Sequence, residues 1–289
     1  MMELLKQLQK KRKIIKVIFL ITFIFFNYTS FLYAKVFSRI LTIEGTFIQG
    51  GLLFGKTKPN SKIFFNDKKI FVNNEGDFLL GISRDEKKEN LLIVNNENKV
   101  EKYNINILSR KYKIQKIDGL PKNKVTPNQE ELKRIKKESK LISKYKNLFL
   151  DKTFYKSGFV WPVEGKITGK YGDQRILNGK PRRPHFGIDI VASLGSKIIS
   201  PSDAIVAFTF ENTFFNGKMI ILNHGLGLNS IYSHLNKIYV KKGDKLKRGD
   251  LLAEVGSTGR ATGPHLHWGM NVFNTAVDPE KLIQNQPKF

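Results

Sequence analysis

The residues that could do chemistry are concentrated in one stretch, because all five histidines of the 289-residue chain lie between positions 185 and 267. The chain contains no cysteine, which excludes disulfides, thiol catalysis and Cys-ligated zinc and leaves histidine and carboxylate as metal ligands. His265 and His267 are two residues apart in an extended segment, so both imidazoles project from one face. The opposite face carries apolar side chains, Leu266, Trp268 and Met270. This pattern is typical of a strand that carries a polar site on one face and buries its apolar opposite face.

A second pair is formed by His185 and Asp189 in the segment HFGIDI. Gly187 and the alternating isoleucines favour an extended segment, and an even spacing in a strand places His185 and Asp189 on one side. Two histidines and one aspartate make a three-ligand set with a fourth position open for water, the general layout of catalytic zinc. Such a metal lowers the pKa of bound water to about 7 and polarises a carbonyl.

The other two histidines could assist such a metal or serve only the fold. In the segment NSIYSHL, strand alternation places Tyr232 and His234 on one face. His224 lies at a predicted turn, and we assign it a structural role. Two further histidines near the metal could move protons and stabilise the tetrahedral oxyanion, so hydrolysis would need no serine or cysteine nucleophile. The chain has no His-Glu-x-x-His helix, so the common metalloprotease motif is not the basis of this prediction.

Residues from about 158 to 284 resemble the lysostaphin-type (LytM-like) zinc metalloendopeptidases of peptidoglycan. The segments that carry the resemblance are HFGIDI, NHGLGLNSIYSHL, VKKGDKLKRGDLLAEVGSTGRATGPHLHWG and AVDP. The resemblance implies that His185, Asp189 and His267 bind one zinc ion and that His234 and His265 are catalytic, with their separate roles open. It also implies hydrolysis of peptide bonds in peptidoglycan stems or cross-links, in cell-wall remodelling, by an antiparallel, barrel-sandwich-like β domain with a groove across it.

Two alternatives use the same segments. Some relatives have lost metal ligands and only activate other hydrolases, so a non-catalytic wall-binding protein or amidase activator on the same fold is the main alternative. This chain keeps every expected ligand, which weighs against it. The paired turns KKGD and KRGD also resemble those of lipoyl- or biotin-carrier domains, which would not need the histidines.

Nothing in the sequence points to glycine bridges, so a D,D-endopeptidase acting on cross-links is favoured.

The organisation along the chain predicts a mainly β protein. Residues 35–117 contain short β-like runs separated by turn residues, which predict a small antiparallel β-sandwich-like accessory domain without catalytic residues. Residues 118–156 form a linker with one helix over 127–146, for which Thr126 is the predicted N-cap and Pro127 the first helical residue. Residues 157–289 are predicted to form the all-β peptidase domain.

The first 34 residues are predicted to be a targeting segment. A cluster of Lys and Arg precedes an apolar run from Val17 to Phe26, and Ala34 follows as a cleavage position. We favour a cleaved signal peptide over an uncleaved anchor that associates with the membrane through residues 14–33. Either outcome exports the protein, to the periplasm or cell envelope. Oligomeric state is not predicted.

The net charge of +25 indicates attraction to polyanions. Removing residues 1–34 takes away six basic residues and one acidic residue and leaves +20. Outside the cytoplasm, anionic cell-wall polymers and lipid headgroups are nearer partners than nucleic acid. We therefore expect peptidoglycan as the partner and no nucleic acid.

Overall fold

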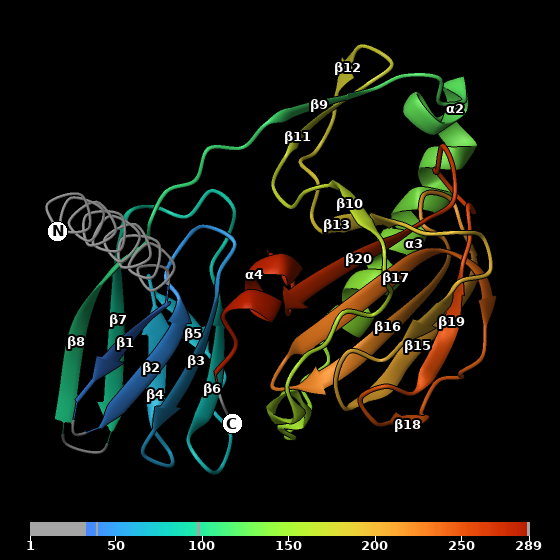
Figure 1. The fold of residues 1–289 in the computed structure, drawn as a ribbon. Coiled ribbons are helices and arrows are strands. Elements are labelled where there is room, and N and C mark those ends of the chain that lie inside the picture. The colour runs from blue at the N-terminus through green and yellow to red at the C-terminus, as the bar shows by residue number, and fades with distance from the viewer. Residues whose placement is uncertain (1–32, 39, 97–98, 288–289) are drawn as a thin grey trace, which may run out of the picture.

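The computed structural model describes residues 33–38, 40–96 and 99–287. The chain is mainly β, as predicted, with an N-terminal and a C-terminal β region side by side and a single long connection running between them (Figure 1). The predicted targeting segment, including the run 14–33, lies outside the described residues except for residues 33 and 34, which begin the first strand. Within the described ranges, no helix has the length and apolar character needed to span a bilayer.

The N-terminal region is a sandwich of two four-stranded antiparallel sheets. One sheet has the order β1-β2-β3-β6 and contains β1 (Tyr33–Phe37), β2 (Leu41–Thr46), β3 (Leu52–Thr57) and β6 (Asp77–Gly81). The other has the order β5-β4-β7-β8 and contains β5 (Lys68–Ile70), β4 (Lys62–Phe65), β7 (Glu89–Asn96) and β8 (Lys99–Asn106). Alternating side chains from both sheets, such as Leu53 and Leu80 opposite Ile63 and Leu92, form one apolar core.

The sandwich packs on the C-terminal region through the outer face of β3 and β6. Leu52, Phe54 and Leu79 belong to the core of the C-terminal region and not to that of the sandwich. Both faces of these strands are therefore buried, which explains why β6 is apolar without alternation. At the edge of this contact, the Arg110 guanidinium lies 2.8 Å from the carboxylate of Asp278, which also caps helix α4 (Pro279–Gln284).

The C-terminal region is built on one strongly curved antiparallel sheet of ten strands. Its main path is β10 (Lys166–Gly169), β13 (Ile188–Val191), β20 (His265–Val272), β17 (Leu228–Ile238), β16 (Gly217–Gly225), β15 (Ala204–Thr213) and β18 (Lys245–Leu246). Three strands pair off this path, β14 (Lys197–Ile199), β19 (Leu251–Val255) and β21 (Thr275–Val277). Leu266, Trp268 and Met270 are fully buried behind β20, as the sequence predicts.

The connection between the two regions contributes a strand to the C-terminal side. β9 (Ile114–Ile117) pairs in parallel with β11 (Gln174–Leu177), which also pairs with β12 (Lys180–Pro181). The strand at the end of the segment assigned to the accessory domain thus pairs with neither sheet of the sandwich. The short helix η1 (Phe154–Ser157) lies where the C-terminal region begins.

Two helices follow β9, where one was predicted. The single-turn helix α2 (Lys122–Val125) was not predicted, and α3 (Gln129–Lys146) is the predicted helix. The predicted N-cap, Thr126, is wrong by two residues. Asn128 is the cap, because its side chain accepts a bond from Glu131 N while the Glu131 side chain bonds back to Asn128 N. Helix α3 packs Tyr145 against β15 and β16, on the face of the sheet opposite to the one that buries Tyr232 and Trp268.

Candidate metal centre

Asp189 and His267 are brought together by two neighbouring strands. β13 and β20 are antiparallel, and their register places Asp189 directly opposite His267. Side chains of directly opposed residues lie next to each other on one face of the sheet. His185, four residues before Asp189, precedes β13 and is buried, with its Nδ1 3.1 Å from the carbonyl oxygen of Lys170. The face shared by Asp189 and His267 is the one that the alternation predicts.

The donor atoms of these three residues converge. His185 Nε2 lies 2.9 Å from His267 Nδ1 and 3.1 Å from Asp189 Oδ1, and His267 Nδ1 lies 2.9 Å from Asp189 Oδ1. In a tetrahedral site with ligand bonds of about 2.0 Å, the donor atoms lie about 3.3 Å apart. The observed separations are close to that value. Within the described ranges, this is the group of histidine and carboxylate side chains that could hold a metal ion.

The charge states of His185 and Asp189 suit a metal. Burial lowers the pKa of His185 to about 4, so its ring is neutral at pH 7. Burial alone would raise the pKa of Asp189, but its contacts with His185 and His267 outweigh that effect and hold it well below the usual value. The Nδ1–H of His185 donates to the Lys170 carbonyl, which leaves Nε2 as the free donor atom. Neutral imidazoles and an ionised carboxylate are the forms that bind metals.

The Arg175 guanidinium of β11 contacts Asp189 through Oδ2. Oδ1, the oxygen nearest to both histidines, is left for a metal. Arg175 also lies 3.4 Å, through Nε, from Oε1 of Gln115 on β9. The parallel pairing of β9 with β11 therefore holds the Asp189 carboxylate through its second oxygen, Oδ2. Arg175 is a site residue that was not predicted, and no motif in the sequence marks it.

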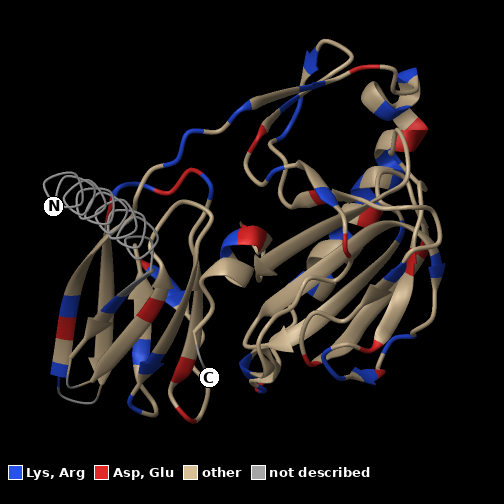
Figure 2. Ribbon diagram, in the orientation of Figure 1, with Lys and Arg blue, Asp and Glu red and all other residues tan. Residues whose placement is uncertain are grey.

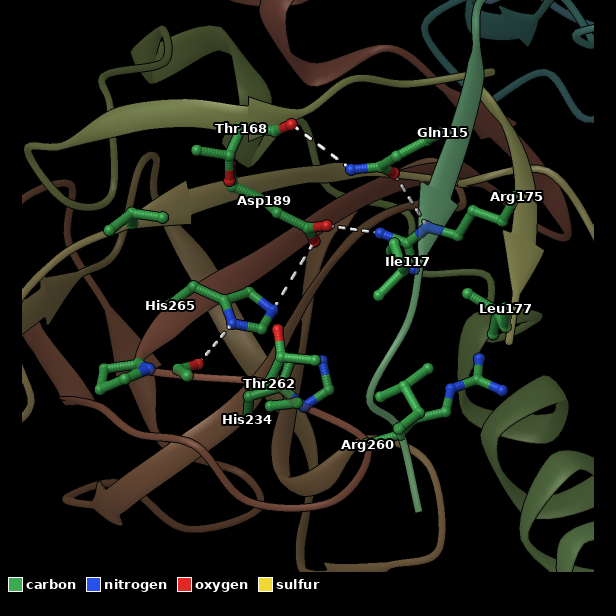
Figure 3. Close-up of a pocket in the computed structure, with 15 residues that line it drawn as sticks. Gln115, Ile117, Thr168, Arg175, Leu177, Asp189, His234, Arg260, Thr262 and His265 are labelled. Carbon is green, nitrogen blue, oxygen red and sulfur yellow. Dashed lines mark hydrogen bonds and ion pairs between the residues drawn. The ribbon is translucent and has the colours of Figure 1, made fainter. Parts of the chain in front are cut away.

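His234 and His265 lie beside this group. Their ring centroids are 4.7 Å apart, and His265 Nε2 lies 4.0 Å from Asp189 Oδ1 (Figure 3). Each ring has its Nδ1 within 2.9 Å of a backbone carbonyl, that of Gly263 for His265 and that of Thr258 for His234. An Nδ1–H that donates to a carbonyl leaves Nε2 with a free lone pair. Burial, and then the neighbouring His265 and His267, lowers the pKa of His234 to about 3, so this ring is neutral.

The backbone at His234 corrects one prediction. The pairing of β16 with β17 shifts its register between Tyr232 and Leu235, and His234 has a φ of +66° with its N–H bonded to Asn216 O at 2.8 Å. Such a bulge changes the direction of one side chain. Tyr232 and His234 therefore do not share a face. Tyr232 is fully buried in the core, whereas His234 lines the cavities in front of the sheet.

Two adjoining cavities, of about 390 and 680 Å³, open at the site, and both are lined by His234. The connection between the two regions supplies part of their walls. Gln115 and Ile117 of β9 stand across the first cavity from His265 (Figure 3), and Leu132 and Ile135 of α3 line the second. These residues lie outside the bounds predicted for the peptidase domain, 157–289. They become part of the site only through the pairing of β9 with β11.

His224 is separate from this group, as its assigned structural role requires. It is fully buried, with Nδ1 2.9 Å from Asp203 O and Nε2 2.7 Å from Ser230 Oγ. Both ring nitrogens are thus satisfied within the protein. It lines neither of the two cavities.

The fold and the site together are typical of metal-dependent hydrolases: a His/Asp/His donor set lies on a curved antiparallel sheet, with His234 and His265 facing an open cavity. Residues 183–279 match peptidase family M23. This region of the chain is therefore an M23 metallopeptidase domain, which confirms the resemblance noted in the sequence. Members of this family depend on a metal, which agrees with the donor set found here.

Curated relatives match the same region. The chain is 38% identical over 97 residues to a protein of Haemophilus influenzae named an uncharacterized metalloprotease, covering 34% of this chain and 20% of that protein. It is 36% identical over 125 residues to the peptidoglycan DD-endopeptidase ShyA of Vibrio cholerae, covering 42% of this chain and 29% of that protein. The chain thus spans less than a third of the length of these two relatives.

A solved structure matches more of the chain. A crystal structure from Pseudomonas aeruginosa, assigned to peptidase M23, has a TM-score of 0.65 and 27% sequence identity. The match covers 84% of this chain and 96% of that one. The shared fold therefore extends beyond the region that matches the family, and the predicted mainly β fold class is confirmed.

Proposed function

We propose that this protein is a zinc endopeptidase that hydrolyses peptide bonds in peptidoglycan stems or cross-links. The observation that carries the proposal is the convergence of the donor atoms of His185, Asp189 and His267 within about 3 Å of one another, beside His234 and His265. The names of the curated relatives support the substrate, since ShyA and ShyB of Vibrio cholerae are named peptidoglycan DD-endopeptidases. On this basis we also propose the D,D-peptide bond of cross-links as the bond that is cut.

Zinc is proposed as the metal because of the donor set. Two imidazole nitrogens and one carboxylate oxygen, with a fourth position open toward a cavity, are typical of catalytic zinc. When bound, the ion would lower the pKa of a water molecule and polarise the substrate carbonyl. His185, Asp189 and His267 would hold one ion per chain.

The two remaining histidines would handle the water and its proton. His265 is assigned as the base, because its Nε2 carries a free lone pair and lies 4.0 Å from Asp189 Oδ1, close to the donor set. His234 is assigned to orient the attacking water by accepting a hydrogen bond at its own Nε2. The residues of β9 and α3 that line the cavities would hold the peptide on either side of the reacting bond.

Export to the periplasm or cell envelope is part of the proposal, and it rests on the sequence of residues 1–34, as does membrane association through residues 14–33. In the part of the chain that the structure describes, Lys and Arg are spread over both β regions and α3 and are interspersed with acidic residues, with no single basic stripe (Figure 2). This distribution supports diffuse attraction to an anionic wall polymer. It gives no support to nucleic acid as a partner.

The test combines metal content with digestion of purified sacculi by the purified full-length chain. We expect about one zinc per chain and release of peptide fragments, which mass spectrometry would assign to a particular bond. Asp189→Ala and His267→Ala should lose both the zinc and the release of fragments. Asp151→Ala, at an exposed aspartate, is the matched control and should behave like the wild type. Digestion that survives in both site variants would refute the proposal, and binding to sacculi without cleavage by the wild type would favour a non-catalytic wall-binding protein.

A further inference from the structure

Arg260 lies at the metal site without an assigned role. It belongs to the loop of residues 256–264 that connects β19 to β20, and its backbone N–H donates to Phe215 O at 2.8 Å. Its guanidinium carbon lies 4.2 Å from the centroid of the Phe215 ring, a cation–π contact that fixes the direction of the side chain. Arg260 lines both cavities together with His234. The guanidinium is therefore held at the wall of the groove, on the His234 side.

The charge of Arg260 is not neutralised by the protein. Within the described ranges it takes part in no ion pair, and its side chain makes one long hydrogen bond, 3.4 Å from Nη1 to the carbonyl oxygen of Lys124. A guanidinium carries five N–H donors, so most of them have no protein acceptor. Arg134, by contrast, bonds both a carboxylate and a carbonyl.

The surroundings of Arg260 add positive charge. Burial, and then the guanidinium groups of Arg175 and Arg182, lowers the pKa of Arg260 to about 10. Arg175 is already paired with Asp189, while Arg182 donates to a neutral group, the carbonyl of Val125, at 2.7 Å. A half-buried cation among other cations is costly, and a bound anion would offset that cost.

We propose that Arg260 binds a carboxylate of the substrate peptide, close to the bond that the metal centre hydrolyses. The inference rests on the proposed function and specifies the substrate class: peptides that carry a free carboxylate beside the cleaved bond. The planar guanidinium fork matches a carboxylate with two parallel hydrogen bonds, and Arg260 lines the same two cavities as His234, so a carboxylate bound there would lie in the groove that leads to the metal donors. An amidated peptide would lose the charge and one of the two acceptors.

The test begins with the bond identified from sacculus fragments and uses two synthetic peptides that span it. The peptides differ only in one group beside the cleaved bond, a free carboxylate in one and a carboxamide in the other. The wild type should cleave the carboxylate peptide with a kcat/KM about 10- to 100-fold higher, the range expected for hydrogen bonds to charged groups. Arg260→Gln should bring the ratio close to one by slowing only the carboxylate peptide. Arg260→Lys, which keeps the charge but not the fork, should give an intermediate ratio.

Arg248→Gln is the matched control, because it removes the same charge from an exposed loop that lines neither cavity. It should leave the ratio unchanged. If Arg260 serves only to hold the linker through the Lys124 carbonyl, Arg260→Gln will slow both peptides equally, and the inference is overturned. A wild type that digests sacculi but does not distinguish the two peptides also overturns it, and this result needs no variant to fold. Failure to digest sacculi at all would instead contradict the proposed function.

Discussion

The two sides of the site are built by different means. On the metal side, Asp189 and His267 stand opposite each other on regular, paired strands. On the other side, His234 sits at a bulge with a φ of +66°, and Gly259, in the loop next to it, has a φ of +74°. Regular strands fix the positions of ligands that must stay within about 3 Å of each other. The irregular backbone places side chains that must reach across the groove. Backbone N–H groups of these irregular segments donate to Asn216 O and Phe215 O and so hold the segments in place.

The largest effect is expected for His234→Ala, which should lower activity without changing the metal side. This change removes a ring that faces the cavity but is not among the metal donors. We expect kcat to fall by about 10²- to 10³-fold, because a group that positions the attacking water is lost. Zinc content, measured by mass spectrometry on the same preparation, should stay at the wild-type level. A loss of zinc would mean that the two sides are not independent.

A smaller effect, about 100-fold, is expected for Gly187→Ala on the metal side. A Cβ at position 187 would lie 2.7 Å from both His267 Cε1 and the backbone oxygen of Trp268, and the oxygen cannot move without disturbing β20. Displacing a ligand by about 1 Å can cost about 100-fold in rate. Zinc affinity and activity should fall together, as measured by titration with a chelator and by peptide release.

Gly263→Ala is the control for this steric argument. Gly263 also lies at the site, but a Cβ there would meet no atom within 4 Å. Its activity and zinc affinity should stay close to those of the wild type. Equal damage from both alanines would show that contact with His267 is not the cause.

Arg175→Gln should lower the zinc affinity of the site without removing a metal ligand. Partners that orient a metal ligand typically contribute 10- to 100-fold to metal affinity, and Arg175 contacts the oxygen of Asp189 that faces away from the histidines. We expect a loss of affinity in this range, with activity restored at saturating zinc. Arg248→Gln, at an exposed position that lines neither cavity, should change neither quantity. Activity that stays low at saturating zinc would assign Arg175 to the chemistry instead.

The same division explains what the sequence could predict. The period of two along HFGIDI and HLHWGM is a local property, and it is enough to place Asp189 and His267 on the site face with Trp268 behind. The position of His234 could not follow from that period, because the bulge depends on the pairing of β16 with β17.

The residues that line the groove could not be predicted either, because they depend on pairing between strands far apart in the sequence. Gln115 and Arg175 are 60 residues apart and meet only through the parallel pairing of β9 with β11. The cap of α3 was wrong for a local reason: Thr126 and Asn128 are both good caps, and the reciprocal bonds of Asn128 with Glu131 decide between them.

The smallest effect is expected for Gly259→Ala, which tests the loop side through its backbone. A Cβ at position 259 would lie 2.3 Å from Gly217 N and 2.5 Å from Phe215 O, so the loop that supplies the Thr258 carbonyl to His234 must shift. We expect kcat to fall about tenfold, less than when the His234 ring itself is removed, with zinc affinity unchanged. Gly243→Ala separates the clash from backbone strain, because Gly243 has a φ of +95° with no atom within 4 Å of a Cβ. If Gly243→Ala lowers kcat as much, general destabilisation explains the result, whereas a tenfold loss confined to Gly259→Ala shows that the loop positions His234.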